Sequence, residues 1–437
     1  MTKDQSTGVA LLGLAGFVLL DAVELDGELH MTVETTASRA ACPECGVFAR
    51  SKGRKTVQVR DMPAGGRPVR LWWRKRRWYC PDGDCENKTW SEQVTAIRAR
   101  AVLTERAGRD ICVRVGRDAA SVAEMAREYL VAWSTAMAAV QTHGRPLVDD
   151  PGWIGSVVEL GVDETAFARS GPGRRPGFVT GMVDLERHRL CDVVRGRSGT
   201  DLRTWLEQRP AGWCEQVKVV AIDPHEGYRQ GLKPHLEHVT LVVDPFHVVA
   251  LANRAIDNCR RRVNQDLLGH RGRKADPLYK IRRVLLTGQE RLSEKAWTRL
   301  HEGLRLGDPD DEVLDAWLAK EKTRDVYLTD DPGEAADLLD AAIGFCEASH
   351  VGEVTTLAKT LTAWRPEILA HHATGASAGP TEAMNLLIEK LRRVGHGFKS
   401  FDNYRLRLLL HCGVDWPARP SHGLRPHPRR RPDKLVA

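Results

Sequence analysis

Two regions of the chain alternate apolar and polar residues with the two-residue period of a β-strand. The first is LLDAVELDGELHMTV, residues 19–33. The second contains the strand VVELGVDETAF, the hairpin GFVTGMVDLERHRLCDVVRG with a turn near Glu186–Arg187, the helix SGTDLRTWLEQRP and the strand VKVVAIDP. The pattern therefore predicts a sheet in each region, and the second sheet has the order strand, two-stranded hairpin, helix, strand.

A helical period separates these two regions, from about residue 91 to residue 144. LTERAGRDICVRVG predicts one amphipathic helix, and SVAEMAREY and AWSTAMAAVQTHG predict a pair with a break near Leu130. The pair has helix-turn-helix proportions, so we expect Ser134 and Thr135, at the start of its second helix, to contact DNA. Such a pair is also common in ordinary helical domains. The segment HGRPLVDDPGWIG that follows is rich in Gly, Pro and Asp and predicts a linker.

Helical periodicity returns after the second sheet region and extends over most of the residues between Asp244 and Glu382. Segments such as VVALANRAIDNCRRRVNQDLLG and GEAADLLDAAIGFCEASH have mixed-charge or Arg-rich faces. A single connection needs far fewer residues, so we expect an all-helical insertion in the sheet domain.

Length and hydropathy favour a multidomain protein outside the membrane. The chain has 437 residues, more than the roughly 250–300 at which single cores stop growing. The apolar run Val9–Leu20 is too short to span a bilayer and lacks a signal-peptide cleavage pattern. We expect a cytoplasmic, nucleoid-associated bacterial protein with no membrane partner.

Four of the ten cysteines cluster in the sequence, in C-P-E-C and C-P-D-G-D-C motifs. They are Cys42, Cys45, Cys80 and Cys85. Four thiolates suit one structural, tetrahedral Zn²⁺ and leave no open position for catalysis. The 34 residues between Cys45 and Cys80 are long for a compact ribbon, and four unrelated buried thiols are the alternative.

The segment between the cysteine motifs is strongly basic. Residues 50–78 contain eleven Lys or Arg against one acid, a larger surplus than the +7 of the whole chain. Tryptophans are interleaved with these charges, as expected of a surface that contacts phosphate. We expect the run Arg74, Lys75, Arg76 and Arg77 to bind DNA, although a basic run can also be a solvated face.

Three acids occur where a strand or helix would hold them rigidly: Asp163, Asp223 and Glu382. Carboxylates gathered from distant segments favour hard divalent metals and phosphoryl chemistry. Each also has an ordinary structural interpretation, as a strand-end acid, an Asx residue before proline, or a helix N-terminal acid. Glu164, Glu389 and Asp244 are the rival candidates.

The motifs GVDE, AIDPHEGY, VVDPFHVV and TEAMNLLIEKLRRVGHGFKSFDNYRLRLLL resemble, in this order, the DDE transposases of bacterial insertion sequences. With the cysteine motifs and the helix pair, the chain resembles the ISL-three group. The resemblance implies a catalytic triad of Asp163, Asp223 and Glu382 that holds two Mg²⁺ or Mn²⁺ ions. It adds Asp244 and His247 as an accessory D-x-x-H element. The family's glutamate is followed by Gly, where this chain has Ala383.

The resemblance also implies partners. They are double-stranded DNA, as terminal inverted repeats and as target, and further copies of the chain, because two ends must be joined. Lys390, Arg392 and Arg393 would hold a phosphate backbone beside the metals. A DNA-binding regulator and an RNase H-like nuclease without strand transfer are the alternatives.

The sequence thus predicts an α/β protein with an RNase H-like mixed sheet and an all-helical insertion, preceded by a zinc-finger module and a helix-turn-helix domain. The predicted parts are an N-terminal strand segment (1–40), the zinc module (41–90), the helix-turn-helix (91–150), the first part of the catalytic core (151–250), the helical insertion (251–365), the core with the glutamate helix (366–415) and a basic disordered tail (416–437).

Overall fold

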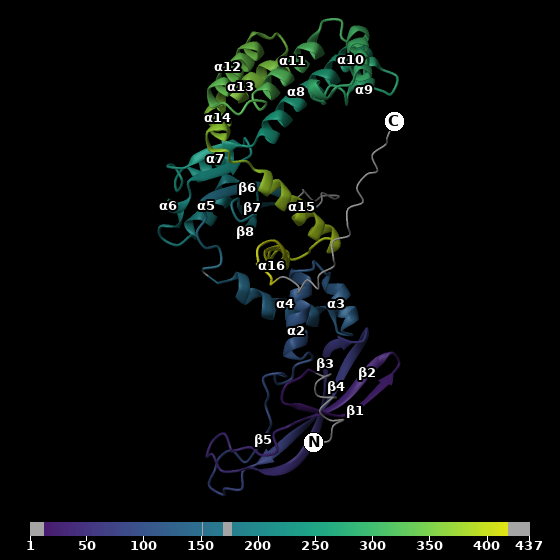
Figure 1. The fold of residues 1–437 in the computed structure, drawn as a ribbon, viewed down its shortest axis with the longest axis vertical. Coiled ribbons are helices and arrows are strands. Elements are labelled where there is room, and N and C mark those ends of the chain that lie inside the picture. The colour runs from purple at the N-terminus through teal and green to yellow at the C-terminus, as the bar shows by residue number, and fades with distance from the viewer. Residues whose placement is uncertain (1–12, 151, 169–176, 418–437) are drawn as a thin grey trace, which may run out of the picture. The chain divides into compact units, whose positions relative to one another are not determined.

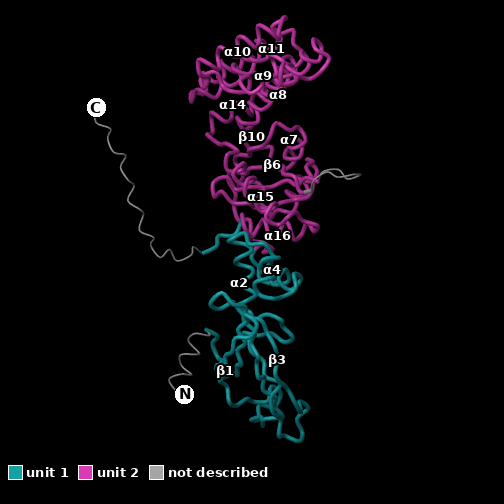
Figure 2. Tube along the Cα trace, turned by 90° about the vertical axis from the view of Figure 1, so that its right-hand side faces the viewer, with its two compact units in different colours: residues 1–147, 413–437 teal, residues 148–412 magenta. Residues whose placement is uncertain are grey.

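The computed structural model describes residues 13–150, 152–168 and 177–417. The chain forms two compact units, residues 1–147 with 413–437 (unit 1) and residues 148–412 (unit 2), coloured separately in Figure 2. All but the first two residues of the predicted basic tail lie outside the described residues. Among the described residues, no helix is both long enough and apolar enough to cross a bilayer.

Unit 1 contains a five-stranded sheet (Figure 1). Its strand order is β1-β2-β4-β3, with β5 paired to β4, and only the β2–β4 pair is parallel. A tight turn at Gly65 and Gly66, with φ values of 59° and 77°, joins β3 to β4. Positive φ at both turn residues is the geometry that two-residue hairpins prefer. The strands are β1 (Phe17–Leu25), β2 (Glu28–Thr35), β3 (Arg50–Ala64), β4 (Arg67–Tyr79) and β5 (Thr89–Ser91).

The β3–β4 hairpin explains the long spacing between the two cysteine motifs. Cys42 and Cys45 precede β3, and Cys80 and Cys85 follow β4. The two motifs therefore meet at the open end of the hairpin, and the basic segment forms its two strands. Alternate residues of these strands, including Val59, Leu71 and Trp73, pack with Val33 of β2 in a small core.

Three helices follow this sheet: α2 (Glu105–Gly116), α3 (Val122–Glu128) and α4 (Trp133–Val148). The side chains of Thr104 and Ser121 cap the first two by accepting hydrogen bonds from backbone N–H groups. Leu130 has a φ of 48° in the turn between α3 and α4, where the sequence predicts a break. Ile111, Met125 and Val140 are buried between the helices.

The sheet of unit 2 has the order β10-β9-β6-β7-β8. β6 pairs antiparallel with β7 and parallel with β9, so the first and fourth strands of this region are neighbours. This confirms the predicted RNase H-like sheet and the hairpin turn between Asp184 and Arg189. The strands are β6 (Glu159–Ala168), β7 (Gly177–Asp184), β8 (Arg189–Arg195), β9 (Val219–Ile222) and β10 (Thr240–Val243).

Helices cover both faces of this sheet. Leu160 and Val162 of β6 belong to the same core cluster as Trp205 of α5 and Tyr228 of α7. On the other face, α15 packs against β6 at Gly161, where a Cβ atom would collide with the Thr381 hydroxyl. The helices concerned are α5 (Gly199–Glu207), α6 (Trp213–Gln216), α7 (Glu226–Leu232), α15 (Gly379–Val394) and α16 (Phe401–Cys412).

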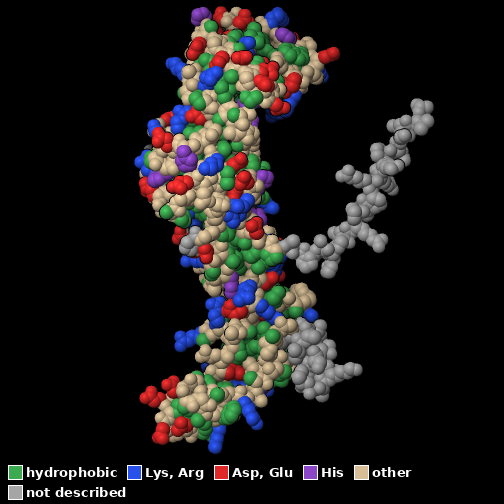
Figure 3. Space-filling model, turned by 60° about the vertical axis from the view of Figure 1, so that its left-hand side comes forward, with side chains coloured by type: hydrophobic (Ala, Val, Ile, Leu, Met, Phe, Trp, Pro, Cys, Tyr) green, Lys and Arg blue, Asp and Glu red, His purple; other side chains and the backbone are tan. Residues whose placement is uncertain are grey.

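The long connection between β10 and α15 is helical, as predicted. Its first helix, α8, begins at Pro245 directly after β10, so the predicted boundary at residue 250 falls inside this helix. The hydrophobic core that packs against the sheet continues into the insertion, where it includes Val248, Trp317 and Leu361. On the face of the insertion that Figure 3 shows (top), Lys and Arg are mixed with Asp and Glu. Its elements are α8 (Pro245–Leu268), α9 (Pro277–Ile281), η1 (Gln289–Arg291), α10 (Glu294–Gly307), α11 (Glu312–Asp325), α12 (Pro332–Ala348), α13 (Gly352–Ala363) and α14 (Arg365–Thr374).

Candidate metal centres and nucleic-acid interface

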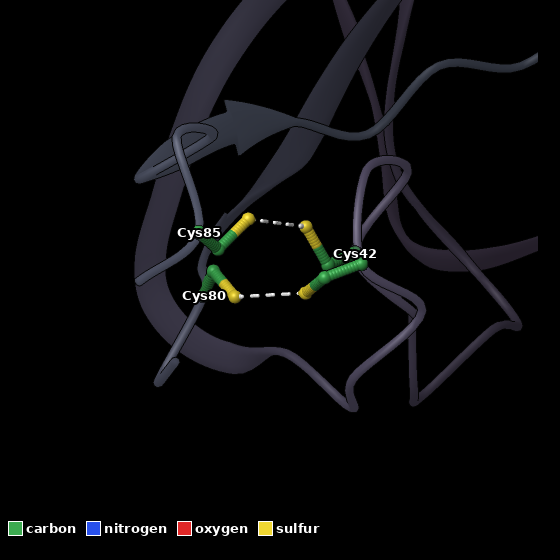
Figure 4. A group of neighbouring side chains, drawn as sticks. Cys42, Cys80 and Cys85 are labelled. Atoms are coloured by element: carbon green, nitrogen blue, oxygen red, sulfur yellow. Dashed lines mark hydrogen bonds between the residues drawn. The ribbon is translucent and has the colours of Figure 1, made fainter. Parts of the chain in front are cut away.

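The four clustered cysteines converge at the open end of the β3–β4 hairpin (Figure 4). Their sulfur atoms all lie within 4.8 Å of one another. The Sγ atoms of Cys42 and Cys85 are 3.7 Å apart, and those of Cys45 and Cys80 are 3.5 Å apart. Zn–S bonds of about 2.3 Å in a tetrahedron place sulfurs about 3.8 Å apart, whereas a disulfide needs about 2.05 Å. The spacing fits a metal-binding set of thiols.

Backbone hydrogen bonds and burial have opposite effects on two of these thiols. In the turn after Cys42, the Gly46 N–H donates to the Cys42 carbonyl at 3.0 Å. Hydrogen bonding from the backbone N–H of Cys45 lowers the pKa of the Cys42 thiol to about 7, whereas burial raises the pKa of Cys85 to about 12. A metal ion would allow the buried thiols to ionise together.

Asp163 and Asp223 come from adjacent parallel strands. β6 and β9 are in register at Val162 and Ile222, so the next residue on each strand is one of the two aspartates. Asp163 lies within β6, and Asp223 directly follows β9. The parallel register therefore brings the two carboxylates together at the carboxyl end of β9.

His247 completes this group. It lies in the first turn of α8, and its Nε2 atom is 2.7 Å from Asp223 Oδ1. Ligand atoms of Asp163, Asp223 and His247 all lie within 4.8 Å of one another. Burial lowers the pKa of His247, but the hydrogen bond to Asp223 and the nearby aspartates outweigh it, so the pKa is raised above 6.5.

Glu382 approaches the same group from the first turn of α15. Its carboxylate is half-buried, and it is not part of the three-residue group within 4.8 Å. Burial, followed by the charges of Asp244 and Asp223, raises its pKa. The structure thus places Glu382 within the field of the aspartates but brings His247 closer to them.

Asn385 links the glutamate helix to β6. It follows Glu382 by one helical turn, and its Nδ2 atom donates a hydrogen bond to Asp163 Oδ2. The other oxygen of Asp163 accepts from the Glu164 N–H at 2.6 Å. From the sequence alone, Asn385 is assigned no role. The signal that could have identified it is its i, i+3 spacing from Glu382, which places both residues on one side of the helix.

The rival aspartate, Asp244, has a structural position. It caps α8 by accepting from the Phe246 N–H at 2.8 Å, and its second oxygen accepts from the Ala378 N–H at 2.7 Å. The residue is 5% exposed. Both oxygens are therefore engaged in holding the start of α8 against the start of α15.

The other rival acids have partners away from the group. Glu164 accepts from the Tyr228 hydroxyl at 3.4 Å and pairs with Arg197. Glu389 pairs with Arg392 at 2.7 Å and Arg393 at 3.1 Å, which lowers its pKa to about 2.

Burial and charge crowding give Asp163 unusual electrostatics. Burial comes first, followed by the charge of Asp223, and together they raise the pKa of Asp163 to about 6. Two carboxylates, a third nearby and an imidazole form a donor set that Mg²⁺ or Mn²⁺ accepts. A bound cation would offset the repulsion that raises this pKa.

The residues predicted to contact DNA occupy three places. Ser134 is exposed at the start of α4 and Thr135 is half-buried. On α15, Lys390 is exposed, whereas Arg392 and Arg393 pair with Glu389.

The basic run of β4 divides between the two faces of the sheet. Arg74 and Arg76 pair with Glu34 at 3.2 and 3.5 Å. Lys75 lies over the Trp73 ring at 4.7 Å, and Arg77 is exposed on the same side of the strand as Lys75.

An RNase H-like sheet with clustered carboxylates, joined to a four-thiol ribbon, defines a nucleic-acid-processing protein. The comparisons identify the class. A family model described as a transposase, that of the ISL3 group of DDE enzymes, matches residues 160–408, and the zinc finger of the transposases of IS204, IS1001, IS1096 and IS1165 matches residues 38–85. The chain belongs to this transposase family. The predicted family and the zinc-ribbon module are thereby confirmed.

Individual relatives agree with this assignment. The transposase for insertion sequence element IS1001 of Bordetella parapertussis is 26% identical over 382 residues, which cover 87% of this chain and 90% of that protein. The transposase for insertion sequence element IS1557 of Mycobacterium tuberculosis is 26% identical over 261 residues, 55% of this chain and 57% of that protein.

Proposed function

We propose that this transposase binds the ends of an insertion sequence, cleaves DNA there and transfers the freed strand to a target, using Asp163, Asp223 and Glu382 as its catalytic carboxylates. The parallel register of β6 and β9 supports this most directly, because it places Asp163 and Asp223 side by side. Glu382 enters from α15, and Asn385 of the same helix is bonded to Asp163.

The donor atoms fit the divalent ions of phosphoryl transfer. Asp163, Asp223 and Glu382 would hold Mg²⁺ or Mn²⁺, with His247 beside them. When bound, a pair of such ions activates the attacking hydroxyl and stabilises the leaving oxygen.

The neighbouring residues fix these carboxylates in place. Asn385 and the Glu164 N–H bind the two oxygens of Asp163. His247 pairs with one oxygen of Asp223. Asp244 joins the first turn of α8, which contains His247, to the start of the glutamate helix. This support shell pre-organises the site.

The proposed reaction has two steps, and in each of them an oxygen nucleophile attacks a phosphodiester. In the first, water attacks the phosphodiester at the end of the element and leaves a 3′ hydroxyl. In the second, that hydroxyl attacks a phosphodiester of the target strand, joins to its phosphate and releases a 3′ hydroxyl on the target. No side chain needs to form a covalent intermediate, so the contribution of the protein is positioning and electrostatic stabilisation.

DNA would be held by several surfaces. Arg74 and Arg76 of the ribbon and Ser134 and Thr135 of α4 are proposed to bind terminal repeats. Lys390 on α15, with Arg392 and Arg393, is proposed to contact the backbone near the carboxylates. Since two ends must be joined, the active complex is proposed to contain at least two chains.

The test uses purified protein, labelled element ends and an unlabelled target, with Mg²⁺ or Mn²⁺. Strand-transfer products from the wild type, and their loss in Asp163→Asn, are the expected result. Cleavage without joining would show a nuclease, and retarded DNA without cleavage would show a regulator; either outcome contradicts the proposal. Asp402→Asn, which neutralises an exposed acid in the first turn of α16, is the matched control and should retain activity.

A further inference from the structure

The sheet of unit 1 has one face without a hydrophobic core. β2, β3 and β4 are paired in register, so residues of one parity share a face. Val33, Val59, Leu71 and Trp73 form the core on one side. The opposite parity of the same strands is dominated by arginine and glutamate.

Two glutamates organise five arginines on this face. Glu34 pairs with Arg54 at 2.8 Å and with Arg74 at 3.2 Å, and Arg76 is 3.5 Å from it. Glu28 pairs with Arg70 at 2.8 Å and also with Arg60. These seven residues are called the arginine face below.

Carboxylates and guanidiniums lie at different depths in the arginine face. Glu28 and Glu34 are only 8% and 7% exposed. By contrast, the side chains of Arg54 and Arg74 are 39% and 46% exposed. The glutamates therefore orient the arginines from below, and N–H groups of the outer arginines remain available to a ligand.

The charge of the arginine face is not balanced. Five guanidiniums meet two carboxylates, which leaves three positive charges in excess. A network that served the sheet alone would require no such excess. Arginine also offers a rigid fork of donors that matches a phosphate, which a lysine ammonium does not.

An aromatic pair lies within the same face. Trp72 lies between Arg70 and Arg74 in the strand, and its Nε1 atom donates to His30 Nδ1 at 3.1 Å. Their ring centroids are 5.9 Å apart. The two rings are tilted by 35° and lie between the Glu28 group and the Glu34 group, so the guanidiniums form two clusters along the strands.

We propose that the arginine face binds the phosphate backbone of duplex DNA, with Glu28 and Glu34 as positioning residues. The inference deepens the proposed function, on which it rests, by separating the basic run into two sides: Arg74 and Arg76 contact phosphate together with Arg54, Arg60 and Arg70. Lys75 and Arg77 lie on the other face and do not take part. Contacts to phosphate orient the DNA without reading its sequence.

The test compares two double variants of the full-length, zinc-loaded protein that remove equal charge. Arg54→Ala with Arg74→Ala alters the arginine face, and Lys55→Ala with Arg77→Ala alters the opposite face. Binding to a labelled duplex is followed by fluorescence anisotropy over a range of salt, without Mg²⁺ or Mn²⁺. The first variant should bind at least tenfold more weakly. The slope of its log affinity against log salt concentration should fall in magnitude by about 1.8, since each phosphate contact contributes about 0.9. The second should stay within twofold of the wild type.

Equal losses in the two variants would show bulk electrostatics and would overturn the proposal. Unchanged duplex binding by the first variant, with loss of binding to polyglutamate, would place an acidic protein on this face and would also overturn it. If the alanine variant does not fold, Arg54→Lys with Arg74→Lys keeps the charge but removes the forks, and it should still weaken duplex binding several-fold. Because no divalent catalytic ion is present, the result is independent of whether the protein joins strands.

Discussion

Asp244 Oδ2 accepts a hydrogen bond from the backbone N–H of Ala378 at 2.7 Å, across 134 residues of sequence. The helical insertion lies between these two residues, so this contact closes it at its base. The same aspartate caps α8 through its other oxygen. One buried carboxylate thus fixes the two helices that present His247 and Glu382.

Asp244→Ala should therefore lower the free energy of unfolding, because Asp244 has a structural role and does not bind the metal. The substitution removes a helix cap and a charge-assisted hydrogen bond, which together contribute about 2–4 kcal/mol. Urea denaturation at neutral pH measures the loss. Asp244→Asn, which keeps one acceptor oxygen, should lose about half as much. An Asp244→Ala protein as stable as the wild type but without metal-dependent cleavage would instead assign Asp244 to the metal site.

His247→Ala should weaken the response to divalent metal. His247 holds Asp223 through a 2.7 Å contact, and loss of such supporting contacts reduces metal affinity or activity about 10–100-fold. Titrating Mn²⁺ in a strand-transfer assay measures the concentration for half-maximal activity. His350→Ala, at an exposed position before α13, is the control. The same Mn²⁺ requirement in all three proteins would show that His247 has no part in the site.

Asp163 predicts a pH dependence of stability in the metal-free protein. Its pKa is about 6 in the fold against an ordinary 3.8, so the folded state binds more protons and its stability falls as pH rises through about 6. The Asp163→Asn variant has no carboxyl group at this position, so its stability should not fall for this reason. Relative to the wild type, the variant should gain about 2 kcal/mol of unfolding free energy between about pH 4.5 and about pH 7.5. Urea denaturation at the two pH values measures the gain, and parallel curves for the two proteins would refute the assignment.

Zinc binding should require the four clustered cysteines of the ribbon and no cysteine outside that cluster. Cys85→Ser removes one of four thiolates, so the bound zinc should fall from about one ion per chain to none. Elemental analysis of freshly purified protein measures this. Cys214→Ser, at a half-buried cysteine outside the cluster, should keep its zinc. Full zinc content in Cys85→Ser would contradict the four-thiolate site.

The sequence predicts the order of elements in unit 2 because strand alternation and helical period are local signals. The β6–β7–β8 hairpins, the neighbouring β9 and the helical insertion agree with it. The cysteine motifs likewise predict the ribbon. The β3–β4 hairpin between them is signalled by the Gly65–Gly66 turn, but lysine and arginine on both parities of β4 mask its alternation.

The neighbourhood of the carboxylates is less local. The D-x-x-H spacing relates His247 to Asp244, but the contact of His247 with Asp223 depends on the position of α8 after β10. Asp244 resembles a metal ligand in sequence, yet its two oxygens bind backbone N–H groups from distant segments. Such roles depend on tertiary contacts that no spacing along the chain encodes.

Glu382 is the corner of the triad that the three-residue group does not include, so it provides the most direct test. Joining of a pre-cut labelled end to target DNA should be measured for Glu382→Gln and Glu389→Gln, two substitutions that remove the same charge from one helix. Loss of about 10³-fold or more in Glu382→Gln, with Glu389→Gln close to the wild type, is the predicted result. Wild-type joining by Glu382→Gln would contradict the proposed triad.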